Sequence, residues 1–259
     1  MRVRTRSFET EYLTAGSGPW LLLAHSLGSS HAMWKHQIDP LARRFHVLAY
    51  DTRGHGKSDC PPGEYTVADL ADDAVRLMDE LGVERAAVVG LSMGGMMGQC
   101  LAAAHPDRLD KLVLADTTSH YEGEGVTLWQ QRAATARSQG LEALAGATME
   151  RWFTPEFRQR QPDEVQRIRD IFTAGDPEGY ALAAGALSRF DVRARLGQIK
   201  APTLVICGEA DPATPPELGR AIASAVPNAR FELIPGASHA SCVEQPERFN
   251  ELVLGFLTS

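Results

Sequence analysis

A serine between two glycines carries the strongest chemical signal in this chain of 259 residues. Residues 90–94 read Gly-Leu-Ser-Met-Gly, after a short apolar run and before a segment with helical spacing. A sharp turn from a strand into a helix exposes the serine hydroxyl, and the helix N-terminus favours developing negative charge. We therefore predict that Ser92 is a nucleophile. We also expect that Gly90 and Gly94 are glycines because larger side chains would collide across the turn.

A serine hydroxyl is a weak nucleophile until a neighbouring base takes its proton. Where the serine occupies such a turn after a strand, the order along the chain is serine, acid, histidine. The chain has eight histidines, and only His239 follows the last predicted strand. We therefore predict that His239 is the general base.

Three carboxylates are candidates for orienting that histidine. Asp211 lies in a short loop after the predicted strand 203–207, and a carboxyl-terminal strand end suits this role. Glu209 lies two residues earlier, and Asp116 follows the predicted strand 111–115, where the acid can also occur. We predict Asp211 as the acid and keep Glu209 and Asp116 as alternatives.

Hydrolysis through a serine also requires N–H donors for the negatively charged oxygen that forms on the substrate. One donor is expected to be the backbone N–H of Met93, the residue after the nucleophile. The second should come from the loop at residues 25–28, which reads His-Ser-Leu-Gly after a predicted strand. We favour the N–H of Leu27, and the alternative is a tight turn without a role in catalysis.

The elements that must position these residues follow from alternating apolar runs and amphipathic segments. Short continuous apolar runs are typical of a parallel sheet covered on both faces. The predicted strands are 20–24, 45–49, 86–89, 111–115, 203–207 and 231–234. Helices are predicted from the N-cap Thr66 to Gly82, from Ser92 to about His105, and over 249–257. The alternation predicts an α/β fold with a doubly wound, mostly parallel sheet.

Strand-like runs are missing between His120 and Asp191, where segments such as 127–151 and 163–172 have a helical pattern. We therefore expect a helical cap at residues 120–192. The cap is inserted into a core formed by residues 1–119 and 193–259.

Composition excludes several classes of function. The net charge of −7, without a basic cluster, argues against binding to nucleic acid or to an anionic membrane. The first residues contain no apolar segment, and no apolar run is long enough to span a bilayer. Four scattered cysteines form no metal or disulfide motif, so we expect reduced thiols and a cytoplasmic protein without metal. The oligomeric state stays open, with a homo-oligomer as one alternative.

Taken together, the motifs resemble those of the 3-oxoadipate enol-lactonases, which are α/β hydrolases. The resemblance covers nearly the whole chain and rests on five segments. They are His25–Gly28, Tyr50–Ser58, Gly90–Gly95, and the cap segments Arg151–Thr154 and Asp176–Tyr180. It implies a Ser-His-Asp hydrolase without cofactor that forms an acyl-enzyme from a five-membered enol-lactone with a free carboxylate. A broad-specificity carboxylesterase is the main alternative. A carbon–carbon bond hydrolase, a perhydrolase and a ligand-binding receptor are further ones.

A substrate with a free carboxylate needs a cation near its tail, because burying an unpaired carboxylate is costly. Arginine suits this task through its planar, forked guanidinium. We predict that Arg132, Arg137 or Arg151 binds the carboxylate, and that Trp152 lines the pocket.

The segment Tyr50–Ser58 places Asp51, Arg53 and His55 on a loop beside the serine turn. Loops in such positions either support the site or contact substrate. We favour a supporting role for this loop.

Overall fold

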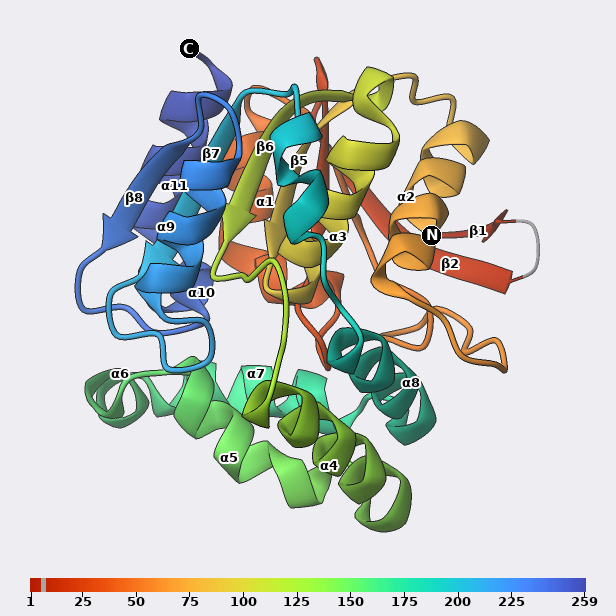
Figure 1. Cartoon of the computed structure of the whole chain (residues 1–259), viewed down its shortest axis with the longest axis vertical. Coiled ribbons are helices and arrows are strands. Elements are labelled where there is room, and N and C mark those ends of the chain that lie inside the picture. Colours follow the sequence, from red (N-terminus) through yellow and green to blue (C-terminus); the bar gives the residue numbers. More distant parts are fainter. Residues whose placement is uncertain (6–7) are drawn as a thin grey trace.

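The computed structural model describes residues 1–5 and 8–259. Within these residues the centre is an eight-stranded sheet in the order β1-β2-β4-β3-β5-β6-β7-β8 (Figure 1). The strands are β1 (Arg2–Thr5), β2 (Phe8–Ala15), β3 (Trp20–Ala24), β4 (His46–Tyr50), β5 (Ala86–Leu91), β6 (Leu109–Ala115), β7 (Thr203–Gly208) and β8 (Arg230–Ile234). Strand β2 pairs antiparallel with β1 and β4, and the other pairs are parallel.

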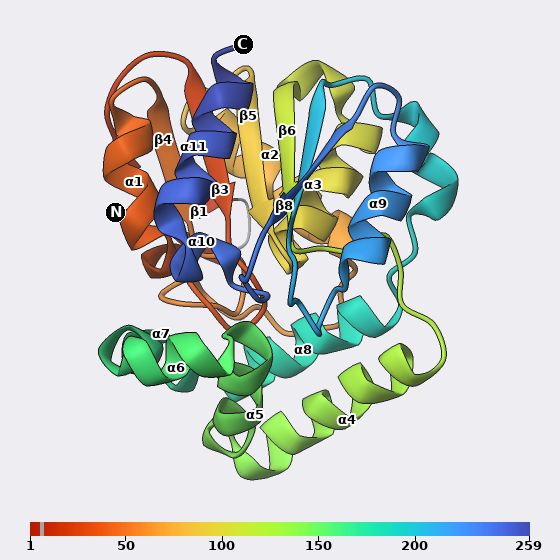
Figure 2. The same ribbon diagram turned by 90° about the vertical axis from the view of Figure 1, so that its left-hand side faces the viewer.

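Helices cover both faces of this sheet, as Figure 2 shows. Helices α1 (Lys35–Ala42) and α11 (Pro246–Leu257) pack together on one face, with the short α10 (Ser241–Glu244) beside them. Helices α2 (Val67–Glu80), α3 (Met93–Ala104) and α9 (Pro216–Ala225) lie on the other. Strand β5 is buried along its whole length, as expected for a parallel strand covered on both sides. The predicted doubly wound α/β sheet is confirmed.

The start of α2 shows how local sequence fixes an element. The Thr66 side chain accepts a hydrogen bond from the Asp69 N–H, and the Asp69 carboxylate accepts one from the Thr66 N–H. This capping box satisfies two N–H groups that the helix leaves without partners, and such a cap contributes about 1 kcal/mol. The predicted N-cap is therefore confirmed.

Five helices form a layer beside the carboxyl ends of the parallel strands, at the bottom of Figure 1. They are α4 (Glu124–Gln139), α5 (Glu142–Trp152), α6 (Pro155–Arg160), α7 (Pro162–Thr173) and α8 (Pro177–Ser188). An antiparallel bridge between His120 and Asp191 joins the two ends of this layer. The predicted cap bounds of 120–192 enclose all five helices and the bridge.

Two predicted elements have different bounds in the structure. The helical pattern over 127–151 is interrupted at Gly140, whose φ of +75° ends α4 before α5 begins, because a left-handed residue cannot continue a right-handed helix. The strand predicted at 45–49 runs from His46 to Tyr50. The hairpin of β1 and β2 was not predicted, since its polar, half-buried residues form no continuous apolar run.

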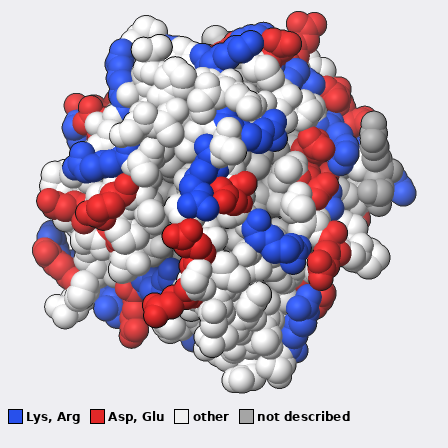
Figure 3. All heavy atoms as spheres, in the orientation of Figure 1, with Lys and Arg blue, Asp and Glu red and all other residues white. Residues whose placement is uncertain are grey.

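The surface is mixed in charge. On the described part of the face in Figure 3, acidic and basic side chains are interspersed over the surface. No helix in the described ranges combines the length and the apolar character needed to cross a membrane. All four cysteines are free thiols, as expected.

Candidate active site

Ser92 lies at the sharp turn between β5 and α3. Its φ of 54° and ψ of −111° lie outside the usual regions for a residue with a side chain, a strain that only well-connected surroundings maintain. The Ser92 N–H donates to the carbonyl of Ala115 at 2.9 Å, and the Thr117 hydroxyl donates to the Ser92 carbonyl at 2.7 Å. Neighbouring β6 and the residues after it therefore hold the turn in place.

The two glycines of the motif are required by two different contacts. A Cβ atom on Gly90 would lie 2.2 Å from the carbonyl oxygen of Gly94, as expected across the turn. A Cβ atom on Gly94 would lie 2.1 Å from the carbonyl oxygen of Ala24, at the end of β3. The expectation for Gly94 is therefore corrected, because the adjacent strand excludes a side chain there.

His239 follows β8 and is hydrogen-bonded to Asp211, which follows β7. The His239 Nδ1–H donates to Asp211 Oδ2 at 2.8 Å, and both side chains are buried. Burial lowers the pKa of His239, but the charge of Asp211, its hydrogen bond and the charge of Asp116 together outweigh burial and hold that pKa above its ordinary value. Burial likewise raises the pKa of Asp211, but His239 and the hydrogen bonds to the carboxylate hold it below its ordinary value. Ser92 and His239 both line one pocket.

The Asp211 carboxylate is itself fixed by the loop that follows it. Oδ1 accepts the backbone N–H groups of Ala213 at 2.7 Å and Thr214 at 3.0 Å. The Thr214 hydroxyl donates to Oδ2 at 2.7 Å. Sequence analysis did not identify Thr214. The available signal was an aspartate followed two and three residues later by N–H donors, as in an Asx-type turn.

The two alternative acids have other partners. Asp116 accepts the Gly208 N–H at 2.7 Å and the Ser241 hydroxyl at 2.5 Å. Burial and the nearby Asp211 charge raise the pKa of Asp116 to about 7. Glu209 is exposed, and its carboxylate accepts the Gly236 N–H at 3.1 Å. Among the described residues, Asp211 is the carboxylate hydrogen-bonded to the His239 imidazole.

One group of potential metal ligands lies beside this pair. Ligand atoms of Asp116, Cys207 and Asp211 lie within 4.8 Å of one another, and all three residues are buried. Both oxygens of each carboxylate already accept hydrogen bonds. Asp211 therefore holds His239, and Asp116 holds Ser241 in the segment that follows His239. The expectation of no metal and no cofactor stays a prediction.

The two expected oxyanion donors lie next to the serine. Met93 begins α3, and Leu27 lines the same pocket as Ser92. Across residues 1–5 and 8–259, neither backbone N–H donates a hydrogen bond to another protein group. Both N–H groups are thus available to a substrate oxygen, as the proposed role requires.

The pocket lies between core and cap and is lined by side chains from both. The core contributes Leu27, Ser92, Ala213 and His239. The side chains from residues 121–180 are Tyr121, Trp129, Arg132, Thr148, Arg151, Trp152, Phe172 and Tyr180.

Two arginines bring positive charge into this pocket. Arg132 is buried and donates to the Tyr180 hydroxyl at 2.8 Å and the Thr148 hydroxyl at 2.6 Å. The Arg151 guanidinium has no hydrogen-bond partner in the described part of the chain, and it lies 5.9 Å from the centre of the Trp129 ring. Burial and the Arg132 charge lower the pKa of Arg151. Neither guanidinium is paired with a carboxylate of the described residues, so the pocket holds uncompensated positive charge.

The comparisons with known proteins agree with this architecture. A model of the family described as the alpha/beta hydrolase fold matches residues 19–246. The chain belongs to this family. The predicted fold and the prediction of a hydrolase are therefore confirmed.

Several relatives of this hydrolase are similar over almost their full length. The 3-oxoadipate enol-lactonase 2 of Acinetobacter baylyi is 39% identical over 93% of this chain and 90% of that protein. The crystal structure of the enol-lactonase from Burkholderia xenovorans LB400 matches with a TM-score of 0.97 and 40% identity, covering 100% of both chains. A thermophilic esterase from Thermogutta terrifontis, solved with malate bound, matches with a TM-score of 0.94 and 32% identity, over 100% of this chain and 98% of that one.

The structure of this hydrolase separates the predicted pocket residues into two groups. Arg132, Arg151 and Trp152 line the pocket. Arg137 does not, and this prediction was wrong: its exposed side chain forms a two-pronged ion pair with Glu178. Arg137 follows Arg132 by five residues on α4, and five residues rotate a helix by about 140°. The two side chains therefore leave the helix on different sides.

Sequence analysis also missed most of the pocket wall. Thr148 and Tyr180 hold Arg132, and Tyr121 and Trp129 lie beside Arg151. No sequence motif marks Tyr121, Trp129 and Thr148, because they come from different segments of the chain. Tyr180 ends the segment Asp176–Tyr180, to which the sequence assigned no role in the pocket. The candidates Asp51, Arg53 and His55 do not line the pocket.

Proposed function

We propose that this hydrolase opens a lactone that carries a free carboxylate, as an enol-lactonase does, through a Ser-His-Asp triad and an acyl-enzyme. The observation that carries the proposal is the pair of arginines in the pocket of Ser92, Arg132 buried and Arg151 half-buried, without a carboxylate partner among the described residues. A buried cation without a counter-ion is unfavourable, so an anionic group of the substrate is the natural partner.

The reaction follows from the hydrogen bonds of the site. His239 accepts the proton of the Ser92 hydroxyl at Nε2 as the oxygen attacks the substrate carbonyl, while Asp211 holds the Nδ1–H. The N–H groups of Leu27 and Met93 stabilise the oxyanion. The ring C–O bond then breaks, and His239 returns the proton to the leaving oxygen or its enol carbon. Water, activated by the same histidine, then hydrolyses the acyl-enzyme.

The wall facing the triad sets the preferred substrate. Apart from the arginines, aromatic rings such as Trp152 and Phe172 surround the space. A small ring fits against these faces while its carboxylate reaches Arg151, whose N–H groups are free among the described residues. The similarity to the two enol-lactonases supports this assignment.

Replacement of the arginines tests the substrate. We expect Arg151→Met to lower kcat/KM for 3-oxoadipate enol-lactone about 10- to 150-fold, the equivalent of a lost charged hydrogen bond of about 1.5–3 kcal/mol. A neutral aryl ester such as 4-nitrophenyl acetate should change less than about twofold. Arg132→Met should act in the same direction. Arg137→Met is the matched control, because that exposed arginine lies outside the pocket.

A broad-specificity carboxylesterase is the second candidate, and the similarity to the Thermogutta terrifontis esterase favours it. It would be the correct assignment if the wild type prefers the neutral ester and the two pocket arginine variants affect both substrates equally. Turnover that stops after one equivalent of product would instead indicate a receptor that retains a slow triad.

A further inference from the structure

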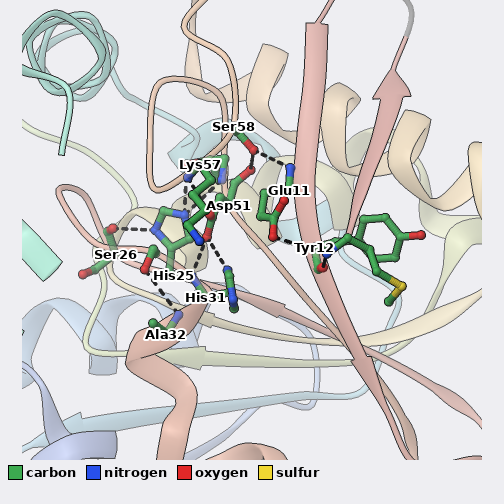
Figure 4. A network of polar contacts seen from close by, with 12 residues as sticks. Glu11, Tyr12, His25, Ser26, His31, Ala32, Asp51, Lys57 and Ser58 are labelled. Carbon is green, nitrogen blue, oxygen red and sulfur yellow. Dashed lines mark hydrogen bonds and ion pairs between the residues drawn. The ribbon is translucent and has the colours of Figure 1, made fainter. Parts of the chain in front are cut away.

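The oxyanion loop at residues 25–31 and the segment Tyr50–Ser58 form one buried polar network, shown in Figure 4. We propose that His25 is a positioning residue that fixes the Ser26–Leu27 peptide so that its N–H becomes the oxyanion donor. This inference rests on the proposed function, which assigns that N–H to the oxyanion. His25 does not line the pocket and acts through the peptide alone.

The hydrogen bonds of His25 determine which nitrogen carries its proton. The backbone N–H of Thr52 donates to Nε2 at 3.0 Å. A backbone amide can only donate, so Nε2 presents its lone pair. The neutral ring therefore carries its proton on Nδ1, which lies 2.8 Å from the carbonyl oxygen of Ser26 and donates to it.

This hydrogen bond orients the next peptide group. The structure contains no cis peptide bond among the described residues, and in a planar trans peptide the C=O and N–H point in opposite directions. The Ser26 carbonyl accepts from His25 and from the Ser29 N–H, the latter at 3.2 Å. The N–H of Leu27 must therefore point away from His25. It donates to no described protein group, while Leu27 itself lines the pocket of Ser92.

The environment of His25 keeps this arrangement constant. The side chain is fully buried, and burial together with the neighbouring His55 lowers the pKa of His25 to about 4. The ring stays neutral near pH 7 and cannot become a second donor towards the Thr52 N–H. A protonated ring would break that contact and release the loop.

The far end of the loop is attached to the same segment through Asp51. Its Oδ1 accepts the backbone N–H and Nδ1 of His31, each at 2.7 Å, and its Oδ2 accepts the Lys57 N–H at 2.8 Å. A Cβ atom on Gly56 would lie 2.1 Å from this carboxylate. The segment Tyr50–Ser58 thus supports the oxyanion loop at both ends, through Thr52 and through Asp51.

His55 provides a matched control for His25. It is the same residue type, is also buried, and its ring centre lies 5.4 Å from that of His25. Its Nδ1 instead donates to the Arg53 carbonyl at 3.0 Å, and none of its hydrogen bonds reaches the Ser26–Leu27 peptide. If substitution only disturbs packing, variants of both histidines should lose activity. If the oxyanion donor is displaced, only variants of His25 should lose activity.

Substitution of His25 by asparagine or by glutamine tests the roles of its two ring nitrogens separately. An asparagine amide places an N–H donor near the position of Nδ1, and a glutamine amide places an oxygen acceptor near that of Nε2. His25→Asn should retain most of the kcat. His25→Gln should lower kcat about 10- to 100-fold with little change in KM, because a displaced donor costs mainly in the transition state. The inhibition constant of a boronic acid, which forms a tetrahedral adduct with the serine, should rise by the same factor.

Three results would overturn the proposal: wild-type kcat in His25→Gln, an equal loss in His25→Asn, or an equal loss in His55→Gln. Circular dichroism melts verify that each variant folds. Nitrogen-15 NMR of the wild type covers the case in which a variant does not fold, since it should show His25 protonated at Nδ1 and not titrating between pH 6 and 8. The opposite tautomer would contradict the proposal. Absence of hydrolysis by the wild type, or activity in Ser92→Ala, would refute the proposed function. The NMR measurement of the His25 tautomer does not depend on hydrolysis, so the two failures can be told apart.

Discussion

The two walls of the pocket are built in different ways. On the core side, Ser92 and Asp211 are held mainly by backbone N–H and carbonyl groups, together with the hydroxyls of Thr117 and Thr214. On the cap side, Arg132 is held by two side-chain hydroxyls, and Arg151 lies against an aromatic ring. Backbone hydrogen bonds fix the core groups independently of any ligand. The cap presents charge that is not yet compensated, so we infer that the core supplies the reaction and the cap supplies selectivity.

The two walls are nevertheless joined beside His239, the proposed general base. The Ser238 hydroxyl donates to the carbonyl of Arg151 at 3.2 Å, and the Ala240 N–H donates to that of Trp152 at 3.0 Å. The loop of His239 is therefore attached to the carboxyl end of α5. Changes in the cap that move α5 should displace the base, whereas changes confined to an arginine side chain should not.

Loss of the nucleophile should have the largest effect and should not depend on the substrate. We expect Ser92→Ala to lower kcat by about 10⁴- to 10⁶-fold for both the lactone and the neutral ester. His239→Ala should fall about as far, and the double variant hardly further, because the two residues act as one unit. Steady-state kinetics and fluorophosphonate labelling measure this. Additive losses, or more than a tenth of the activity in Ser92→Ala, would contradict it.

The next prediction compares two buried aspartates of the core. Asp211→Asn should lower kcat about 10⁴-fold, because it removes the carboxylate that holds the imidazole. Asp116→Asn should cost less than about tenfold, since Asp116 contacts Ser241 and Gly208 rather than the imidazole. Kinetics of the two variants on one ester give the comparison. The reverse order would assign the acid to β6.

The dependence of activity on pH should be set mainly by two core residues, His239 and Asp211. The pKa of His239 lies above its ordinary value because of Asp211, so the neutral base is lost as pH falls through that raised pKa. We expect kcat/KM to decline as pH falls through that pKa and to be more than tenfold lower at pH 5. Arg151→Met should move the inflection on the neutral ester to higher pH, because the Arg151 charge lowers the pKa of His239. A flat profile down to pH 5 would contradict a histidine base.

The smallest effect concerns a contact between the cap and the core, away from the pocket. Glu164 of α7 accepts from His36 of α1 at 2.9 Å and pairs with Arg167, which donates to the Ala32 carbonyl of the core. Burial raises the pKa of Glu164, but its partners outweigh burial and lower that pKa to about 2. The stabilisation is therefore complete above the unfolded pKa of about 4.3 and is lost as pH falls towards 2.

Glu164→Gln should lower the free energy of unfolding by about 1 kcal/mol at pH 7, a Tm decrease of about 2–4 °C. Turnover of the neutral ester should stay within about twofold. Glu156→Gln is the control, because Glu156 forms an exposed pair within α6. Thermal melts at pH 7 and pH 3 measure the difference, and an equal Tm shift in both variants would show that the contact to the core contributes nothing.

Local sequence determined the parts that depend on backbone sterics and periodicity. Gly90 beside Ser92, the capping box at Thr66 and the buried apolar strands follow from contacts within a few residues or from burial of a whole strand. Gly94 instead depends on Ala24 of the neighbouring strand β3. Chain order then restricted the base to His239. The polar hairpin of β1 and β2 was missed because its stability comes from pairing across the sheet edge.

Only the tertiary structure decided which side chains meet. The sequence placed Asp116 and Asp211 alike at the ends of parallel strands, and the loop after β8 brings His239 to Asp211 and Ser241 to Asp116. It placed Arg132 and Arg137 alike on one helix, and the packing of α4 against α8 turned only Arg132 into the pocket. Periodicity fixes the face of an element, but partners depend on how distant elements pack, and that information lies outside any single segment.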